Sequence, residues 1–197
     1  MAWLGFTTFS PAEDLVAVPI RVTAPTLYPV TLDELKSELQ ILDDDSVNGR
    51  LKRILGQAAD QVERDTNRVL MTQTWKLLID RFPAEILLPK VPVQSVSFIK
   101  YTIGGVLTTL DSTLYQTDFA SEPCRIRPIL GRYWPYYDPW TLNAVQIQWI
   151  AGYTSQSLVP PVAKAAVLYA ARQMYYGCSM GDGYWDLINR VKGFGFV

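Results

Sequence analysis

Residues 47–69 read VNGRLKRILGQAADQVERDTNRV, and this stretch decides the fold because it is the longest helical pattern in the chain. Its apolar side chains recur every three or four positions, which places them on one face of a helix. On the opposite face, Asp60 and Arg64 are four positions apart, a spacing that supports an exposed helix surface. The stretch therefore predicts an amphipathic helix with one buried face. The residues expected in that face are Val47, Leu51, Ile54, Leu55, Ala58, Val62 and Val69.

A shorter helix is expected directly before it, over residues 31–42. Thr31 and Glu34 have the spacing of a capping box, in which each side chain accepts a hydrogen bond from the other residue's backbone N–H. Residues 1–29 are interrupted by prolines, which exclude a long helix and favour an extended arm that lies along a surface. These prolines are Pro11, Pro19, Pro25 and Pro29.

An acidic turn, Asp43–Gly49, separates the two expected helices. Read from Asp44, it has the oxygen-bearing residues of the first half of a calcium loop. The twelfth position of that loop is Leu55, however, where a bidentate glutamate is required. A polar turn whose Asp and Ser side chains cap the next helix is the favoured interpretation. No metal site and no cofactor are therefore predicted.

After residue 72 the apolar period changes to two, which is typical of β-strands. Gly104-Gly105 has the composition of a hairpin turn, and the short connections require antiparallel pairing. A third helix is expected over residues 160–176, with prolines in its first turn and Gly177 as its C-terminal cap. A short fourth helix is expected around residues 184–191. The expected strands cover residues 74–80, 94–102, 106–110, 115–119, 124–129 and 144–150.

The predicted fold class is α+β, with a helical core of about four helices and an inserted small antiparallel β-sheet over residues 72–152. Residues 1–29 are expected to form the arm and residues 30–180 the central domain. Residues 181–197 are expected to form the short helix and a C-terminal tail.

The composition limits the possible functions. The 197 residues contain no histidine, which removes the commonest general base and most zinc sites. The net charge of −1 provides no positive field for tight, sequence-independent DNA binding. Only 19% of the residues are charged, whereas aromatic residues reach 12%. Either the core is rich in aromatic side chains or partner chains cover part of the surface.

The compartment also follows from the sequence. Met1–Phe6 carries no basic residue, so no secretory signal is expected, and no stretch approaches the about 20 apolar residues of a membrane span. Cys124 and Cys178 do not have the spacing of a metal motif and are expected to be buried free thiols. We therefore expect a soluble protein that is made in the cytosol.

Several short motifs, in this order and spacing, resemble the head–tail connector (adaptor, or head-completion) proteins of tailed bacteriophages and gene-transfer particles. The resemblance extends from Thr31 to about Tyr176. Its motifs are Thr31-Leu32-Asp33-Glu34, Val62-Glu63-Arg64-Asp65-Thr66-Asn67-Arg68, Thr72-Gln73-Thr74-Trp75, Arg81-Phe82-Pro83, Leu88-Pro89, Pro92-Val93-Gln94-Ser95-Val96, Tyr115 with Asp118, Arg125-Ile126, Trp134-Pro135, Ala151-Gly152-Tyr153 and Val159-Pro160.

This resemblance implies a structural subunit of the virion neck and no active site. It implies a ring, typically of twelve copies, beneath the portal protein, which extends the DNA channel and forms a platform for tail attachment. The partners would be the portal protein, neighbouring copies of the chain, and a downstream stopper or tail-terminator protein. DNA would pass through at genome ejection without sequence-specific binding. The chain would be made in the host cytoplasm.

Two segments are the candidate partner-binding surfaces. A tail with two glycines cannot hold its phenylalanines rigidly, so they need a groove on a partner or, alternatively, on their own subunit. The aromatic loop 133–140 would form an apolar patch if exposed. Arg125 and Arg127 share a face of one strand, either at a subunit interface or in solvent. The candidate docking residues are Trp185, Leu187, Ile188, Phe194, Phe196 and Val197 in the C-terminal segment, and Trp134, Tyr136, Tyr137 and Trp140 in the loop.

Other functions remain open at this level. A tail-completion or stopper protein would occupy a different layer of the same neck. A glycan-cleaving tail component would need two carboxylates about 5–9 Å apart across a cleft, and no motif marks such a pair. A nucleic-acid-binding module is disfavoured by the balanced charge.

Overall fold

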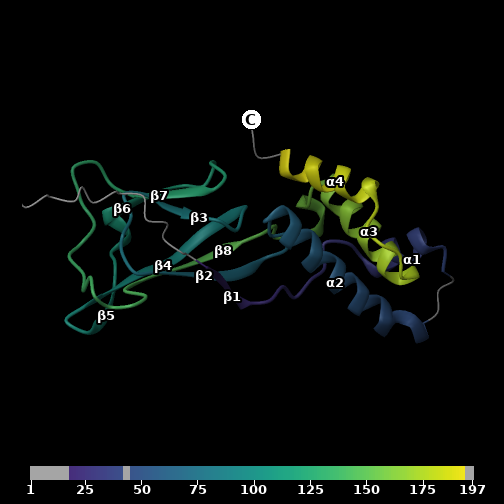
Figure 1. Cartoon of the computed structure of the whole chain (residues 1–197), viewed down its shortest axis with the longest axis horizontal. Coiled ribbons are helices and arrows are strands. Elements are labelled where there is room, and N and C mark those ends of the chain that lie inside the picture. Colours follow the sequence, from purple (N-terminus) through teal and green to yellow (C-terminus); the bar gives the residue numbers. More distant parts are fainter. Residues whose placement is uncertain (1–17, 42–44, 194–197) are drawn as a thin grey trace, which may run out of the picture.

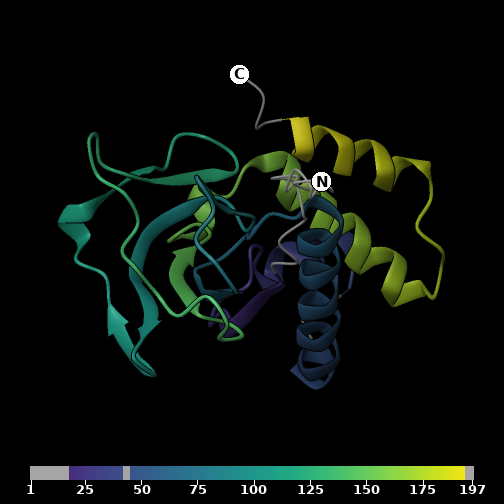
Figure 2. The same ribbon diagram turned by 60° about the vertical axis from the view of Figure 1, so that its left-hand side comes forward.

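The structure is a computed structural model and describes residues 18–41 and 45–193. Helices gather at one end of an elongated molecule and strands at the other (Figure 1), and a turned view shows the same division (Figure 2). The elements in chain order are β1 (Pro19–Thr23), α1 (Leu32–Leu39), α2 (Asn48–Thr66), β2 (Gln73–Ile79), β3 (Ile86–Leu88), β4 (Val93–Ile103), β5 (Val106–Thr109), β6 (Tyr115–Asp118), β7 (Cys124–Pro128), β8 (Val145–Ala151), α3 (Pro161–Tyr176) and α4 (Asp182–Gly193).

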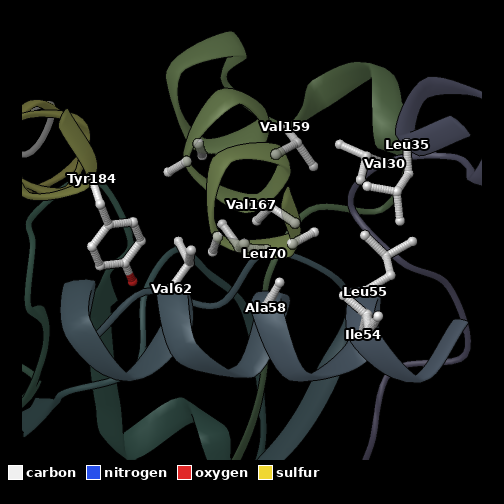
Figure 3. Packing of buried hydrophobic residues seen from close by; sticks show 14 of the residues in the cluster. Val30, Leu35, Ile54, Leu55, Ala58, Val62, Leu70, Val159, Val167 and Tyr184 are labelled. Carbon is white, nitrogen blue, oxygen red and sulfur yellow. The ribbon is translucent and has the colours of Figure 1, made fainter. Parts of the chain in front are cut away.

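The helical end is built around α3, which contacts α1, α2 and α4. Small side chains such as Ala163, Ala166 and Ala170 are fully buried and let the neighbouring helices approach closely. The apolar face of α2 packs below α3, and Val30 and Leu35 close the far side of this core (Figure 3). All the strands from β2 to β8 lie between α2 and α3 in the sequence. The predicted α+β class, with strands inserted into a helical core, is confirmed.

Of the three helix-capping features predicted from the sequence, the structure contains two. Glu34 donates its backbone N–H to the Thr31 hydroxyl at 3.1 Å, and its carboxylate accepts the Thr31 N–H at 2.6 Å, so the capping box is present. The helix α3 ends at Gly177, which adopts a left-handed conformation with φ of 70°. The helix α2, by contrast, begins after Val47 with no side-chain cap. The N-cap residue is therefore Val47 and not an Asp or Ser, while Asp43 and Asp44 of the predicted turn lie outside the described residues.

The strands form two antiparallel sheets instead of the single small sheet that was predicted. One has the order β1-β2-β8-β4-β5 and the other the order β3-β7-β6. Two strands were missed because prolines surround them: β1 begins at Pro19, and β3 has only three residues before Pro89. The strand β1 pairs with β2, so the later part of the arm lies along a sheet edge as expected. A second core, with Trp149 fully buried, lies between the two sheets.

Glu63 joins the helical end to the five-stranded sheet. Although it follows the buried Val62 in the sequence, it is also buried, and its carboxylate accepts hydrogen bonds from the Leu70 N–H at 2.8 Å and from the Gln73 side chain at 2.8 and 3.0 Å. Burial raises the pKa of Glu63 above 4.5, against the lowering effect of the hydrogen bond from Gln73. The helix α2 and the strand β2 are therefore connected through one buried acid.

The raised pKa predicts how Glu63→Gln will change stability with pH. Folding favours the protonated form of Glu63. The contribution of this carboxyl group to the free energy of unfolding is therefore complete below about pH 4.5 and is lost as the pH rises through the folded-state pKa. Urea unfolding at pH 4, 5, 6 and 7 should therefore show the stability of Glu63→Gln rising relative to the wild type as the pH increases. Glu63→Ala leaves two donors unpaired and should cost about 1–3 kcal/mol for each. A pH-independent difference between the wild type and Glu63→Gln would refute the raised pKa.

Candidate docking surface

The loop between β7 and β8, residues 129–143, is the candidate docking surface and is called the docking loop below. Its inner side rests on Phe82, which follows β2. Trp134 stacks on the Phe82 ring with 4.8 Å between centroids, and Tyr137 contacts the same ring edge-on at 5.5 Å. The Trp134 indole N–H also donates to the Pro83 carbonyl at 2.6 Å. These aromatic contacts attach the loop to the sheet region.

Polar contacts hold the second half of the docking loop. The Asp138 backbone N–H donates to the Thr102 carbonyl at 2.9 Å, and its carboxylate accepts the Gly105 N–H at 2.9 Å. Asp138 therefore connects the loop to the β4–β5 hairpin. Near the end of the loop, the Asn143 N–H donates to the Asp80 carboxylate at 2.6 Å. The loop is thus supported at several points along its length.

The outer side of the docking loop carries large apolar side chains that contact little of their own chain. Supporting contacts hold the backbone, whereas these side chains point to solvent, an arrangement typical of protein-interaction sites. They are Leu130 at 100% exposure, Tyr133 at 92%, Tyr136 at 75%, Trp140 at 96% and Leu142 at 80%.

The structure divides the predicted loop residues into two groups. Tyr136 and Trp140 are exposed, whereas Trp134 and Tyr137 face inward and support the loop. Sequence reasoning did not select Leu130 or Leu142, which flank the aromatic cluster on the exposed side. An irregular loop has no periodicity to separate inner from outer side chains, so no sequence signal could have assigned them.

The C-terminal candidates are divided as well. Trp185 is 47% exposed at the surface of α4, and Leu187 is partly buried against the helical core. Ile188 is fully buried in that core, so its predicted place in a docking surface is incompatible with this packing of α4. Phe194, Phe196 and Val197 lie outside the described residues.

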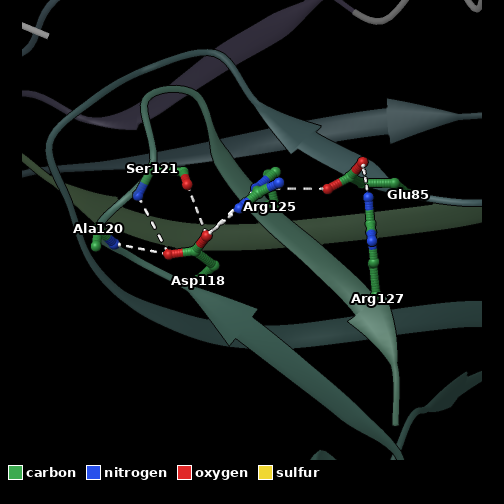
Figure 4. Close-up of polar contacts among 6 residues, drawn as sticks. All are labelled: Glu85, Asp118, Ala120, Ser121, Arg125 and Arg127. Atoms are coloured by element: carbon green, nitrogen blue, oxygen red, sulfur yellow. Dashed lines mark hydrogen bonds and ion pairs between the residues drawn. The ribbon is translucent and has the colours of Figure 1, made fainter. Parts of the chain in front are cut away.

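Arg125 and Arg127 form ion pairs within their own chain, and both side chains also remain about half exposed to solvent (Figure 4). Arg125 donates to Asp118 at 2.6 Å, and Arg127 donates to Glu85 at 2.8 Å. The hydrogen bond from the Ser121 hydroxyl is the main reason why the pKa of Asp118 lies well below its usual range, and the hydrogen bond from Arg125 is the second. This network connects β3, β6 and β7 across the face of the smaller sheet.

The described residues give no sign of a metal or thiol site. Within residues 18–41 and 45–193, no cluster of three or more Cys, Asp or Glu side chains is placed to hold a metal ion. The calcium-loop alternative begins at Asp44, outside those ranges. Cys124 is buried, and burial raises the pKa of its thiol to about 11. Cys178 is exposed, which corrects the prediction that both thiols are buried.

Residues 29–103 match the family of phage gp6-like head-tail connector proteins. This part of the chain is similar to the phage head–tail connectors. The resemblance drawn from the sequence motifs is thereby confirmed. No curated protein matches the chain. In the described part of the chain, no helix is long and apolar enough to cross a membrane.

Chains in solved structures of gene transfer agent (GTA) particles share the fold of this chain. A chain from the neck of an empty GTA particle, computed with C6 symmetry, is similar with a TM-score of 0.73 and 23% identity, over 89% of this chain and 95% of that chain. A chain from the virion of a native GTA particle has a TM-score of 0.72 and 23% identity, and the match covers 88% of this chain and 94% of that chain. A chain from the neck of a native GTA particle, computed with C12 symmetry, has a TM-score of 0.69 and 25% identity, and the match covers 89% of this chain and 94% of that chain.

Proposed function

We propose that this chain is a head–tail connector, a structural subunit of the neck of a phage-like particle, where copies form a ring of twelve beneath the portal protein. The observation that carries the proposal is the match of residues 29–103 to the head–tail connector family. It is supported by the similarity of nearly the whole chain to a subunit of a neck computed with C12 symmetry. The ring extends the DNA channel and presents a platform for a stopper or tail-terminator protein.

The charge of the chain suits a channel wall. A net charge of −1 offers passing DNA little overall attraction, because sequence-independent binding depends on clustered positive charge. Several arginines are also neutralised locally, as in the pairs of Arg125 with Asp118 and Arg127 with Glu85. DNA can then slide through at genome ejection. The proposal assigns no catalytic activity to the protein.

The docking loop and the C-terminal segment are the surfaces through which the subunit meets its partners. Exposed Trp and Tyr side chains are the types most enriched among the residues that dominate interface energies. Tyr136 and Trp140 in the docking loop fit a neighbouring copy or the next protein of the neck. Trp185, with Phe194, Phe196 and Val197 of the tail, fits the portal protein.

Replacing the exposed aromatic side chains should remove assembly while preserving the fold. Tyr136→Ser combined with Trp140→Ser changes only solvent-facing side chains, so the free energy of unfolding should stay within about 0.5 kcal/mol of the wild type. If each anchor contributes about 2 kcal/mol, affinity for the neighbour in the assembly should fall by at least about 100-fold. Native mass spectrometry of the protein, alone and with its portal protein, measures both ring and complex formation.

Two further variants make this test specific. Leu158→Ser removes an apolar side chain that is 58% exposed outside the docking loop, and it should leave assembly unchanged. Trp185→Ser tests the portal-facing surface separately and should weaken portal binding while free subunits remain folded. Deletion of residues 184–197 is unsuitable, because it removes the buried Tyr184, Ile188 and Val191. Full rings and portal complexes from the Tyr136/Trp140 double variant would contradict the assignment of the docking loop.

A further inference from the structure

A groove of about 490 Å³ lies where the helical end meets the smaller sheet. Its volume falls within the range of sites that hold small ligands or peptide side chains. One wall comes from the C-terminal end of α2 and the residues after it, and another from the segments around β3 and β7. The end of α4 provides the remaining wall. The lining residues are Asp65, Thr66, Asn67, Arg68, Pro89, Val91, Glu122, Pro123 and Lys192.

The groove combines apolar surface with charges of both signs, because Asp65 and Glu122 line it together with Arg68 and Lys192. Pro89, Val91 and Pro123 provide apolar surface for a side chain of the same character. Arg68 is mostly buried and paired with Glu122, so its planar guanidinium is held in place. Arginine and lysine cations bind favourably over the face of an aromatic ring. The groove is therefore suited to an aromatic side chain, and Lys192 can contribute a second cation.

The chain itself supplies such side chains next to the groove. The helix α4 ends at Gly193, one residue after the groove-lining Lys192. The sequence continues Phe194-Gly195-Phe196-Val197. Phe194 is two residues beyond Lys192, which corresponds to at most roughly 7 Å of extended chain. Because the tail is tethered at the groove edge, its effective concentration there is on the order of millimolar or higher.

We propose that in the free subunit this groove binds the subunit's own segment Phe194–Val197, with Phe194 seated in the groove. The groove would then cover the two phenylalanines of this segment before assembly. A partner that takes up the tail must compete with the groove, so the tail becomes available only when the subunit docks. This inference concerns the isolated protein and does not depend on ring formation or portal binding.

Disulfide trapping in the isolated protein tests the proposal. Pro89→Cys in the groove and Phe196→Cys in the tail are combined with Cys178→Ser, which removes the exposed native thiol. Oxidation in dilute solution should give an intramolecular disulfide, seen as a faster monomer band on non-reducing gels. A control pair of Thr109→Cys with Phe196→Cys should not react, because Thr109 lies on β5 at the opposite end of the molecule (Figure 1).

A further substitution distinguishes binding of Phe194 in the groove from proximity that comes only from the covalent link of the tail to α4. Adding Phe194→Ser to the reactive pair removes the proposed anchor but leaves the tether and both thiols intact. The rate of disulfide formation should fall at least about fivefold, since losing an anchor costs 1 kcal/mol or more. An unchanged rate would show that tethering alone brings the thiols together and would overturn the proposal. Disulfides formed mainly between molecules, or none at all, would also overturn it.

Discussion

Gly152→Ala should lower the stability of the fold by about 3 kcal/mol. Gly152 has φ of +101°, which side-chain-bearing residues rarely adopt, and the strain alone costs about 1–3 kcal/mol. A Cβ atom would also lie 2.3 Å from the Met71 carbonyl oxygen and 2.9 Å from Val69 Cγ1, so the backbone must move. Overpacking of this kind adds about 1–3 kcal/mol. Thermal unfolding should shift down by roughly 6–12 °C.

The control for this prediction is Gly131→Ala in the docking loop. Gly131 also has a positive φ, of +78°, but a Cβ atom added there would meet nothing within 4 Å. Only the conformational cost of roughly 1–2 kcal/mol should therefore appear. If the two variants unfold at the same temperature, the close approach of Gly152 to Met71 does not hold in solution.

Tyr184→Ala should detach α4 from the helical core at a cost of about 3–5 kcal/mol. The Tyr184 side chain is fully buried and points toward α2 (Figure 3). Its hydroxyl donates a hydrogen bond to the Asp65 carboxylate at 2.6 Å. The pKa of Tyr184 is raised above 10, mainly by burial and secondly by the hydrogen bond to Asp65. The hydroxyl therefore stays a donor at neutral pH. Hydrogen exchange should show α4 amides losing protection before those of the sheets.

Tyr184→Phe separates the hydrogen bond from the packing. It keeps the ring and removes the donor to a charged acceptor, so the expected loss is about 1.5–3 kcal/mol. Asp65 retains the hydrogen bond from the Gln61 side chain at 2.9 Å, which limits the loss of stability in Tyr184→Phe. Protection of the α4 amides should therefore persist in Tyr184→Phe. Equal loss of protection in both variants would mean that the hydroxyl, and not the ring, holds α4.

The predictable part of the fold was the part with strong local signals. The periodicity of α2, the capping box at Thr31 and the Gly177 cap each follow from local chemistry, and the structure contains all three. The strand β3 could not be predicted, because three residues between prolines gain their pairing only from β7. The division into two sheets is likewise decided by contacts between distant segments.

The same distinction explains the outcome for the candidate surfaces. Aromatic composition selected residues 133–140 as a candidate surface, but only tertiary packing on Phe82 turns Trp134 inward and leaves Trp140 exposed. Ile188 was selected because of its neighbours in the sequence, whereas the helical period of α4 buries it with Tyr184. Glu63 belongs to a sequence motif that gives it no structural role. Its buried position requires Gln73 and the Leu70 N–H, which no local pattern reveals.

The strand β8 gives the molecule a mechanical property. It leads directly out of the docking loop and pairs along its whole length with β2 on one side and with β4 on the other. A load applied to Trp140 would therefore act on both ladders in shear, so that many hydrogen bonds resist it together. The strand ends near Ala151, together with contacts such as the pairs of Arg21 with Asp60 and Arg68 with Glu122, connect the sheets to the helical end. A pull on the loop would thus be distributed over the sheet before it reaches the helical end.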